Sequence, residues 1–207
     1  MFKYESLKYD SLADLVAIAE KIDMPLSSVV LQEQAETAET TTDAMYQKMA
    51  YALEIMRDSV KDGLDPDKRS ASGLTGGDAY KMMQAVKEGK NICGKVFGEA
   101  LTKALAVSET NASMGRIVAA PTAGSCGILP AAILTIAEDR NIPDHDVIMA
   151  LFTASAVGMV IANNASIAGA EGGCQAECGA ASAMAAAAVV EMCGGTPQMC
   201  VNACAIA

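Results

Sequence analysis

The stretch that decides the fold runs from residue 168 to residue 190 and reads AGAEGGCQAECGAASAMAAAAVV. Between Ala165 and Val190, 19 of 26 residues are Ala, Gly, Ser or Cys. Side chains this small bury little area each, so a helix that carries them is stabilised by the close approach of neighbouring backbones. The stretch therefore predicts a helix that lies deep in the molecule.

The overall composition favours an all-α fold around that helix. Of the 207 residues, 52% are hydrophobic and only 4% are aromatic, with 13 Met and no Trp. Ala, Leu and Met favour helices, and a chain of this length can bury one substantial core. We expect residues 1–207 to form a single compact helical bundle, with a central buried Ala-rich helix and Gly-rich loops between helices.

Apolar periodicity predicts the individual helices. Residues 11–22 carry apolar side chains at helical spacing, with Ser11 as N-cap and Asp14 three residues later. A second helix is expected from about Pro25, and a third over residues 41–64, where Gly63 suits the end. Further helices are expected from about Asp78 and over ILPAAILTIAED, residues 128–139.

Residues 147–170 carry no charge over a length that could cross a bilayer. The run contains several Thr, Ser and Asn residues, and no Lys or Arg flanks it. A central helix that is buried all round therefore explains it better than a membrane span. Residues 1–12 lack the apolar segment of a signal peptide, so we expect a cytoplasmic protein.

The charge excludes some classes of partner. The net charge is -10, the pI is about 4.5, and no Lys or Arg follows Arg140. Such a protein has no electrostatic reason to bind nucleic acid or an anionic membrane surface.

Two glycine-rich loops each precede an expected helix. They are LTGGD, residues 74–78, and PTAGSCG, residues 121–127. Glycines let the chain turn and expose backbone N–H groups, and a helix N-terminus can hold an anion. A single loop of this kind is more commonly a plain connection between helices. Together with the Gly-Gly-Cys turn at 172–174, they indicate that three helix ends converge on one pocket.

Seven cysteines are present, and five lie between Cys174 and Cys204. Disulfides are not expected in the cytoplasm, and buried cysteine is a common core residue. Cys174 follows two glycines at an expected helix start, which favours the thiolate form. Three chemical interpretations stay open: a four-thiolate zinc site, a nucleophile paired with His145, and an iron–sulfur cluster. The zinc site would use Cys174, Cys178, Cys200 and Cys204.

The chain resembles, in the order and spacing of three stretches, the alpha chain of the bacterial two-subunit iron–sulfur L-serine dehydratase. These stretches are SASGLTGGDAYKM at 70–82, GRIVAAPTAGSCGILPAAIL at 115–134 and NNASIAGAEGGCQAECGAASAMAAAAVVEMCGGTPQ at 163–198. The resemblance implies a lyase of amino-acid degradation that converts L-serine to pyruvate and ammonia. It also implies a beta-chain partner, and an exposed apolar face would allow a homo-oligomer.

The resemblance implies a [4Fe-4S] cluster held by three cysteines, without pyridoxal phosphate. The first ligand corresponds to Cys174, whereas Cys178 falls where other members often carry an aliphatic residue and is expected to fill the core. The two other family ligands lie in CDPVAG and VPC stretches that do not occur in residues 1–207. We therefore expect this chain alone to hold no intact cluster and to be inactive. No ligand role is assigned to Cys193, Cys200 or Cys204.

The implied mechanism needs an open iron that binds the substrate hydroxyl as a Lewis acid, and a base that removes the alpha proton. The base stays open among Glu171, Glu177, a hydroxyl and a thiolate. The resemblance and the helix-end argument together assign the substrate carboxylate to the two glycine loops. The candidate residues are Thr75, Gly76, Gly77, Thr122, Gly124, Ser125 and Gly127.

The sequence bears differently on three rival functions. A pyridoxal phosphate enzyme needs a Schiff-base lysine, and no lysine follows Arg140. A related lyase acting on L-cysteine or L-threonine is compatible with the same motifs. A helical module that only binds a partner predicts no substrate binding at all.

Overall fold

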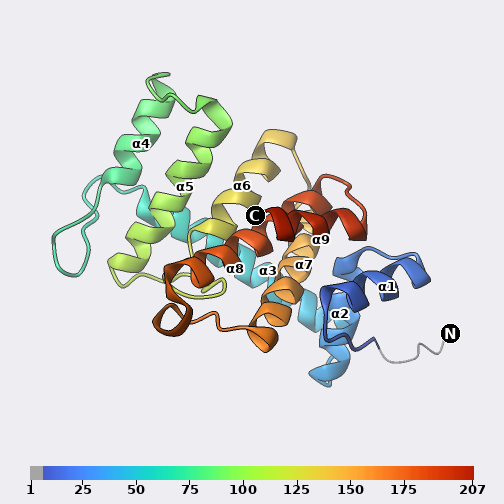
Figure 1. Cartoon of the computed structure of the whole chain (residues 1–207). Coiled ribbons are helices and arrows are strands. Elements are labelled where there is room, and N and C mark those ends of the chain that lie inside the picture. The colour runs from blue at the N-terminus through green and yellow to red at the C-terminus, as the bar shows by residue number, and fades with distance from the viewer. Residues whose placement is uncertain (1–6) are drawn as a thin grey trace.

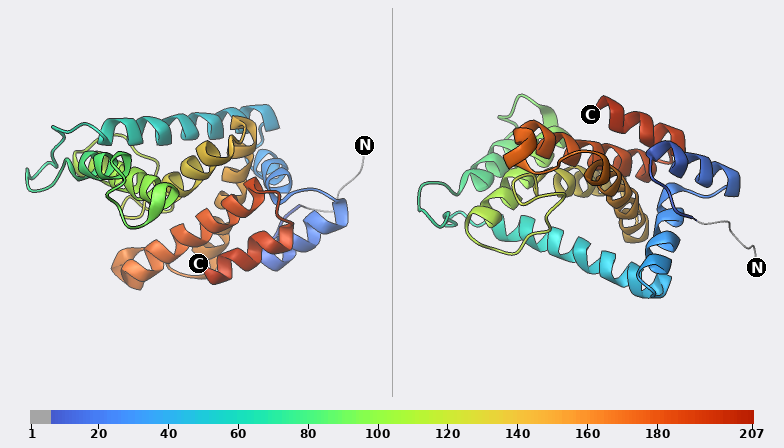
Figure 2. Two further views of the ribbon diagram at one scale, coloured as in Figure 1. Left: turned by 90° about the horizontal axis from the view of Figure 1, so that it is seen from above. Right: turned by 60° about the horizontal axis from the view of Figure 1, so that its bottom comes forward.

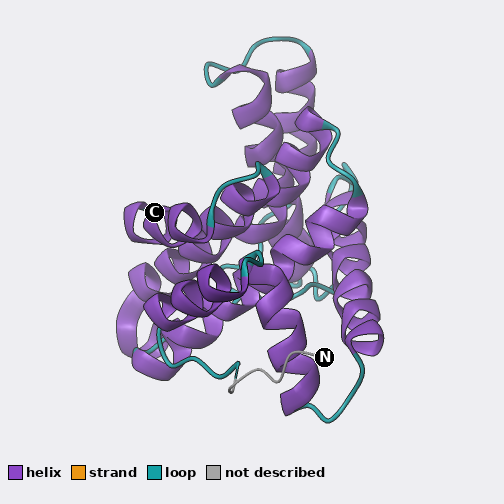
Figure 3. Ribbon diagram, turned by 90° about the vertical axis from the view of Figure 1, so that its right-hand side faces the viewer, coloured by secondary structure: helices purple, strands orange, loops and turns teal. Residues whose placement is uncertain are grey.

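The computed structural model describes residues 7–207, and every regular element in that range is a helix (Figure 3). This confirms the predicted all-α class. The signal-peptide prediction concerns residues 1–12, of which residues 1–6 lie outside the described part. The described helices are α1 (Leu12–Ile22), α2 (Leu26–Thr37), α3 (Thr42–Gly63), α4 (Asp78–Lys87), α5 (Gly94–Ala112), α6 (Ile128–Arg140), α7 (Asp144–Asn164), α8 (Gly169–Met192) and α9 (Pro197–Ile206).

Local sequence signals start the first three helices where they were predicted. The Ser11 hydroxyl accepts a hydrogen bond from the Asp14 amide at 3.1 Å, and the Asp14 carboxylate accepts one from the Ser11 amide at 3.1 Å. This reciprocal pair is a capping box, which satisfies backbone donors left over at a helix start. Helix α2 begins directly after Pro25, and the Thr41 hydroxyl caps α3.

The helices form layers. Helix α3 runs along one side of the molecule and α8 and α9 lie along the opposite side (Figure 2). Helices α5, α6 and α7 each contact α3, whereas α6 and α7 also contact α8. Helices α4 and α5 pack as a pair at the end of the molecule away from α1 and α2 (Figure 1).

Helix α7 is the central apolar helix of the core. By length and composition it is the one described helix that could cross a membrane, which is weak evidence because buried core helices pass the same test. Phe152 and Ala154 have no exposed surface, and α2, α3 and α8 all pack against the helix. The structure thus agrees with the prediction of a buried helix from Val147 to Gly158, whereas the helix ends at Asn164 and residues 159–170 are exposed or only partly buried.

The Ala-rich helix α8 is buried only in its second half. Most residues from Ala180 to Ala188 are buried, whereas most of the segment from Gly169 to Gly179 is exposed. Gly173 lies within the exposed segment and interrupts the helix there, because its backbone angles (φ 73°, ψ 177°) are not helical. The prediction of a deep helix therefore holds for the second half alone.

Candidate functional site

The loop at residues 121–127 is tied to α8 through Glu177. The Thr122 hydroxyl donates a hydrogen bond to the Glu177 carboxylate and lies 3.1 Å from the Ser125 hydroxyl. Gly124 lies against the same carboxylate, since a Cβ built there would stand 2.6 Å from Glu177 Oε1. Two motifs that are 55 residues apart in the chain therefore meet in space.

Cys174 stands directly after the kink in α8, within the exposed segment of that helix. It directly follows Gly173, whose non-helical backbone interrupts the helix, and its side chain is exposed. The thiol thus precedes Glu177 by about one helical turn. Cys178 is exposed as well, so the prediction that it fills the core is wrong. The reason is that the first turns around the kink lie outside the core, where even apolar positions face solvent.

The other glycine loop is held by a side chain of α5. The backbone amides of Gly77, Asp78 and Ala79 donate to the Glu109 carboxylate at 2.9, 2.7 and 3.0 Å. Glu109 is only 8% exposed, so it fills the position at the start of α4 where an external anion would otherwise bind. That Gly77 contacts the substrate stays a prediction, but its amide already has an internal partner.

Glycine is required in this loop for two reasons. Gly76 and Gly77 have φ values of 136° and 80°, in the region that side chains rarely adopt. A Cβ on Gly76 would also stand 2.2 Å from the Lys68 carbonyl oxygen. Thr75, by contrast, is exposed, and its carbonyl accepts a hydrogen bond from the Ser70 amide at 2.8 Å.

The end of α5 links the two glycine loops. Asn111, two residues beyond Glu109, donates from Nδ2 to the Ala123 carbonyl at 3.0 Å. The structure therefore brings both loops to one end of α5, and Glu177 joins α8 to one of them. The sequence analysis missed Glu109 and Asn111, because each binds a segment distant in the chain and neither belongs to a local motif.

The last two residues of the 121–127 loop are packed tightly against the rest of the molecule. Cys126 is buried, and burial raises the pKa of its thiol, with a further contribution from the charge of Glu177. The thiol is therefore neutral at physiological pH and packs as a small apolar group. Gly127 lies so close to α5 that a Cβ there would stand 2.6 Å from the Ala104 carbonyl oxygen. No side chain caps the start of α6.

The structure does not support a zinc site at the cysteines or a cysteine nucleophile paired with His145. All seven thiols are free, and burial raises the pKa of Cys200 to about 12 and that of Cys204 to about 11. Within residues 7–207 no group of three His, Cys, Asp or Glu side chains is placed to hold a metal ion, which argues against the four-thiolate zinc site. His145 lies in the first turn of α7 and stacks on Tyr46, so it pairs with an aromatic ring rather than a thiol.

Comparison with known proteins identifies the family. The family model described as "Serine dehydratase alpha chain" matches residues 21–207. The chain belongs to this family. It is 43% identical over 198 residues, or 96% of its length, to the "Probable L-serine dehydratase, alpha chain" of Bacillus subtilis, and 37% identical over 93% of its length to the "L-serine dehydratase, alpha chain" of Peptoniphilus asaccharolyticus.

The serine dehydratase family also contains longer relatives. The "L-serine dehydratase 2" of Escherichia coli is 34% identical over 206 residues, which cover 94% of this chain and 44% of that protein. The chain spans 66% of each of the two alpha chains named above. The family membership confirms the resemblance that the three sequence stretches indicated.

Proposed function

We propose that the chain supplies the helical catalytic part of an L-serine dehydratase, which converts L-serine to pyruvate and ammonia. Membership of the serine dehydratase alpha chain family supports the class of reaction. The observation that carries the proposal is the contact between Thr122 and Glu177, because it joins the PTAGSCG loop to the helix that presents Cys174. Two of the stretches that carry the family resemblance thus meet at this contact.

Of the two glycine loops, we assign the substrate carboxylate to the 121–127 loop rather than to the 74–78 loop. The amides at the start of α4 are already bound by Glu109, whereas no side chain caps the start of α6. The Thr122 hydroxyl donates to Glu177 in this structure, so the substrate carboxylate would take the place of the Glu177 carboxylate beside the Thr122 and Ser125 hydroxyls. Binding there would hold the amino acid beside α8.

Removal of the alpha proton needs a base near the bound amino acid. Glu177 faces the 121–127 loop, and Glu171 accepts a hydrogen bond from the Ser166 hydroxyl at 2.7 Å. Glu177 is the better candidate of the two, because it touches the loop to which we assign the carboxylate. A thiolate and a deprotonated hydroxyl stay open as alternatives.

The described residues do not by themselves fit a three-cysteine iron–sulfur cluster. Cys174 is exposed at the site, but no group of three His, Cys, Asp or Glu side chains in residues 7–207 is arranged to hold a metal ion. The proposal for this chain is limited to Cys174 as one ligand of the cluster in the complete enzyme.

The test compares two neighbouring thiols in the complete enzyme, prepared anaerobically with its beta subunit. Cys174→Ala should lose bound iron and reduce pyruvate formation from L-serine by at least about a hundredfold, since a first ligand is removed. Cys178→Ala is the matched control, because this thiol is equally exposed on the same helix, and should keep both. L-threonine and L-cysteine are assayed alongside to identify the preferred substrate.

Two results would contradict the proposal. Unchanged iron content and turnover in Cys174→Ala would remove the ligand assignment. Absence of turnover with all three amino acids, in an enzyme that binds its beta subunit, would instead favour a module that only binds a partner.

A further inference from the structure

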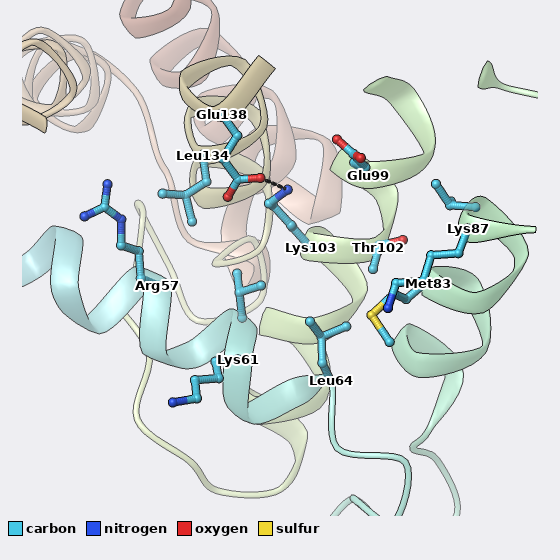
Figure 4. Close-up of a pocket in the computed structure, with 12 residues that line it drawn as sticks. Arg57, Lys61, Leu64, Met83, Lys87, Glu99, Thr102, Lys103, Leu134 and Glu138 are labelled. Atoms are coloured by element: carbon cyan, nitrogen blue, oxygen red, sulfur yellow. Dashed lines mark ion pairs between the residues drawn. The ribbon is translucent and has the colours of Figure 1, made fainter. Parts of the chain in front are cut away.

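A cavity of about 510 Å³ lies between α3, α4, α5 and α6 (Figure 4). This volume falls within the range of small-molecule sites, about 300–1,000 Å³. Aliphatic and thioether side chains form much of its wall: Val60, Leu64, Met83, Val86 and Leu134. The apolar part of a ligand in this cavity would therefore be buried against these side chains.

The charged groups of the cavity carry an excess of positive charge. Its lining includes four cationic side chains, Arg57, Lys61, Lys87 and Lys103, but only two acidic ones, Glu99 and Glu138. This excess contrasts with the net charge of -10 of the whole chain. The positive charge at the cavity therefore attracts anions, although the protein as a whole is acidic.

Two of the four cations are already neutralised. The Arg57 guanidinium donates to both oxygens of Asp144, at 2.7 and 2.5 Å. The Lys103 amine, whose side chain is 11% exposed, lies 2.8 Å from Glu138 (Figure 4). Neither cation is available to a ligand without breaking an existing ion pair.

Lys61 and Lys87 remain, and they point in different directions. No carboxylate of residues 7–207 lies within ion-pair distance of either amine. In Figure 4 the side chain of Lys87, an exposed residue, extends toward Met83 at the cavity, whereas the Lys61 amine projects away from the cavity. One uncompensated positive charge thus faces the apolar wall.

We propose that this cavity binds an aliphatic monocarboxylate. The Lys87 amine would bind the carboxylate, whereas the Thr102 hydroxyl already donates its proton to the Gly98 carbonyl at 2.8 Å. The hydrocarbon chain would lie along Val60, Leu64 and Leu134. A single available cation favours one negative charge on the ligand, rather than the two of a phosphate.

This site is distinct from the one described above. None of the residues that line the cavity belongs to the 121–127 loop, to the 74–78 loop or to α8. The proposal therefore stands independently of the dehydratase reaction.

The test is titration of the complete protein with octanoate, followed by calorimetry and by thermal unfolding. Octanoate should bind and raise the melting temperature, whereas octanol and octylamine should bind at least about tenfold more weakly, because they lack the negative charge. Lys87→Gln should weaken octanoate binding by about tenfold or more. Lys61→Gln, a change of the same type at the cavity rim, should leave it unchanged.

Each contrary result overturns the proposal. These results are absence of octanoate binding, equal binding of octanol, or an unchanged affinity in Lys87→Gln. Displacement of octanoate by L-serine would place the ligand at the other site and would overturn it as well.

Discussion

At the scale of single residues, Glu109 is the side chain on which the 74–78 loop depends most directly. Its carboxylate accepts hydrogen bonds from three successive amides at the start of α4, and it does so from a buried position on α5. Gly77, which precedes α4, has no side chain to cap the helix itself. Glu109 therefore replaces a local cap with one supplied across the molecule, and it also offers negative charge to the positive end of the helix dipole.

We predict that Glu109→Gln destabilises the protein by about 1–3 kcal/mol, because a buried amide donor is then left without an acceptor. The Gln amide nitrogen would face backbone N–H groups that can only donate. The measurement is the urea midpoint of unfolding. Glu54→Gln removes the same charge at an exposed position of α3 and should shift the midpoint little. Equal shifts in the two variants would contradict the role of Glu109 as a cap.

Local and distant helix caps differ in how well the sequence predicts them. Ser11 and Asp14 lie within one turn of the helix they start, so their spacing predicts their bonds. Glu109 lies 32 positions from Gly77, and nothing in its own neighbourhood distinguishes it from the other glutamates of the chain. A nonlocal cap becomes visible only when the packing of two helices is known.

At the scale of helices, Glu191 connects α8 to α2 and α7. Its carboxylate accepts hydrogen bonds from the Ser27 amide, at 3.3 Å, and from the Thr153 hydroxyl. Burial raises the pKa of Glu191, although these hydrogen bonds partly oppose the shift. The neighbouring Cys200 thiol on α9 lines a cavity with Glu191 and has a raised pKa, so it adds no charge at neutral pH.

The sign of the pH effect follows from the raised pKa. Below the ordinary pKa of a glutamate, the carboxyl is protonated in both the folded and the unfolded chain, and its contribution to stability is complete. As the pH rises through the higher pKa of the folded state, the buried group must ionise, and that contribution is lost. The charged form of Glu191 therefore lowers the free energy of unfolding at neutral pH.

We predict that Glu191→Gln raises the melting temperature at pH 7, and that its difference from the wild type shrinks as the pH falls toward about 4.5. The Gln oxygen can accept from Ser27, and the Thr153 hydroxyl can rotate to accept from the Gln amide. Thermal unfolding at several pH values measures this. Glu171→Gln, at an exposed position of α8, is the control and should show no such trend. A destabilised Glu191→Gln at pH 7 would show that the charge itself is required.

Helix α8 shows where the sequence pattern is ambiguous at this scale. Its small residues predict close packing throughout, but Gly173 breaks the helix and leaves the segment with Cys174 and Cys178 outside the core. A run of Ala, Gly and Cys carries no polar stripe to separate a buried face from an exposed one. The family motif, rather than periodicity, is what marked this segment as the candidate site.

At the scale of the whole molecule, the sequence predicts the helical class and most helix starts, because both depend on local composition and caps. It does not predict which helices cross closely. Gly63 was expected to end α3 by its conformational freedom, but its backbone does not need a positive φ. Instead a Cβ there would stand 1.9 Å from the Ala106 carbonyl oxygen, so the glycine permits α3 and α5 to touch.

Gly63 and Gly158 form a matched pair that tests whether backbone contact holds the layers together. At Gly63 the obstacle to a Cβ is the backbone of α5, which cannot move without separating two helices. At Gly158, in the buried middle of α7, the nearest atom is the Met184 sulfur at 2.9 Å, and a methionine side chain can rotate away.

We predict that Gly63→Ala costs about 1–3 kcal/mol or more of unfolding free energy. Gly158→Ala should stay near neutral, because the gain in helix propensity offsets the repacking. Urea unfolding of both variants decides between them. If Gly63→Ala proves as stable as Gly158→Ala, α3 and α5 do not depend on backbone contact at this crossing, and the layers are held by side-chain burial alone.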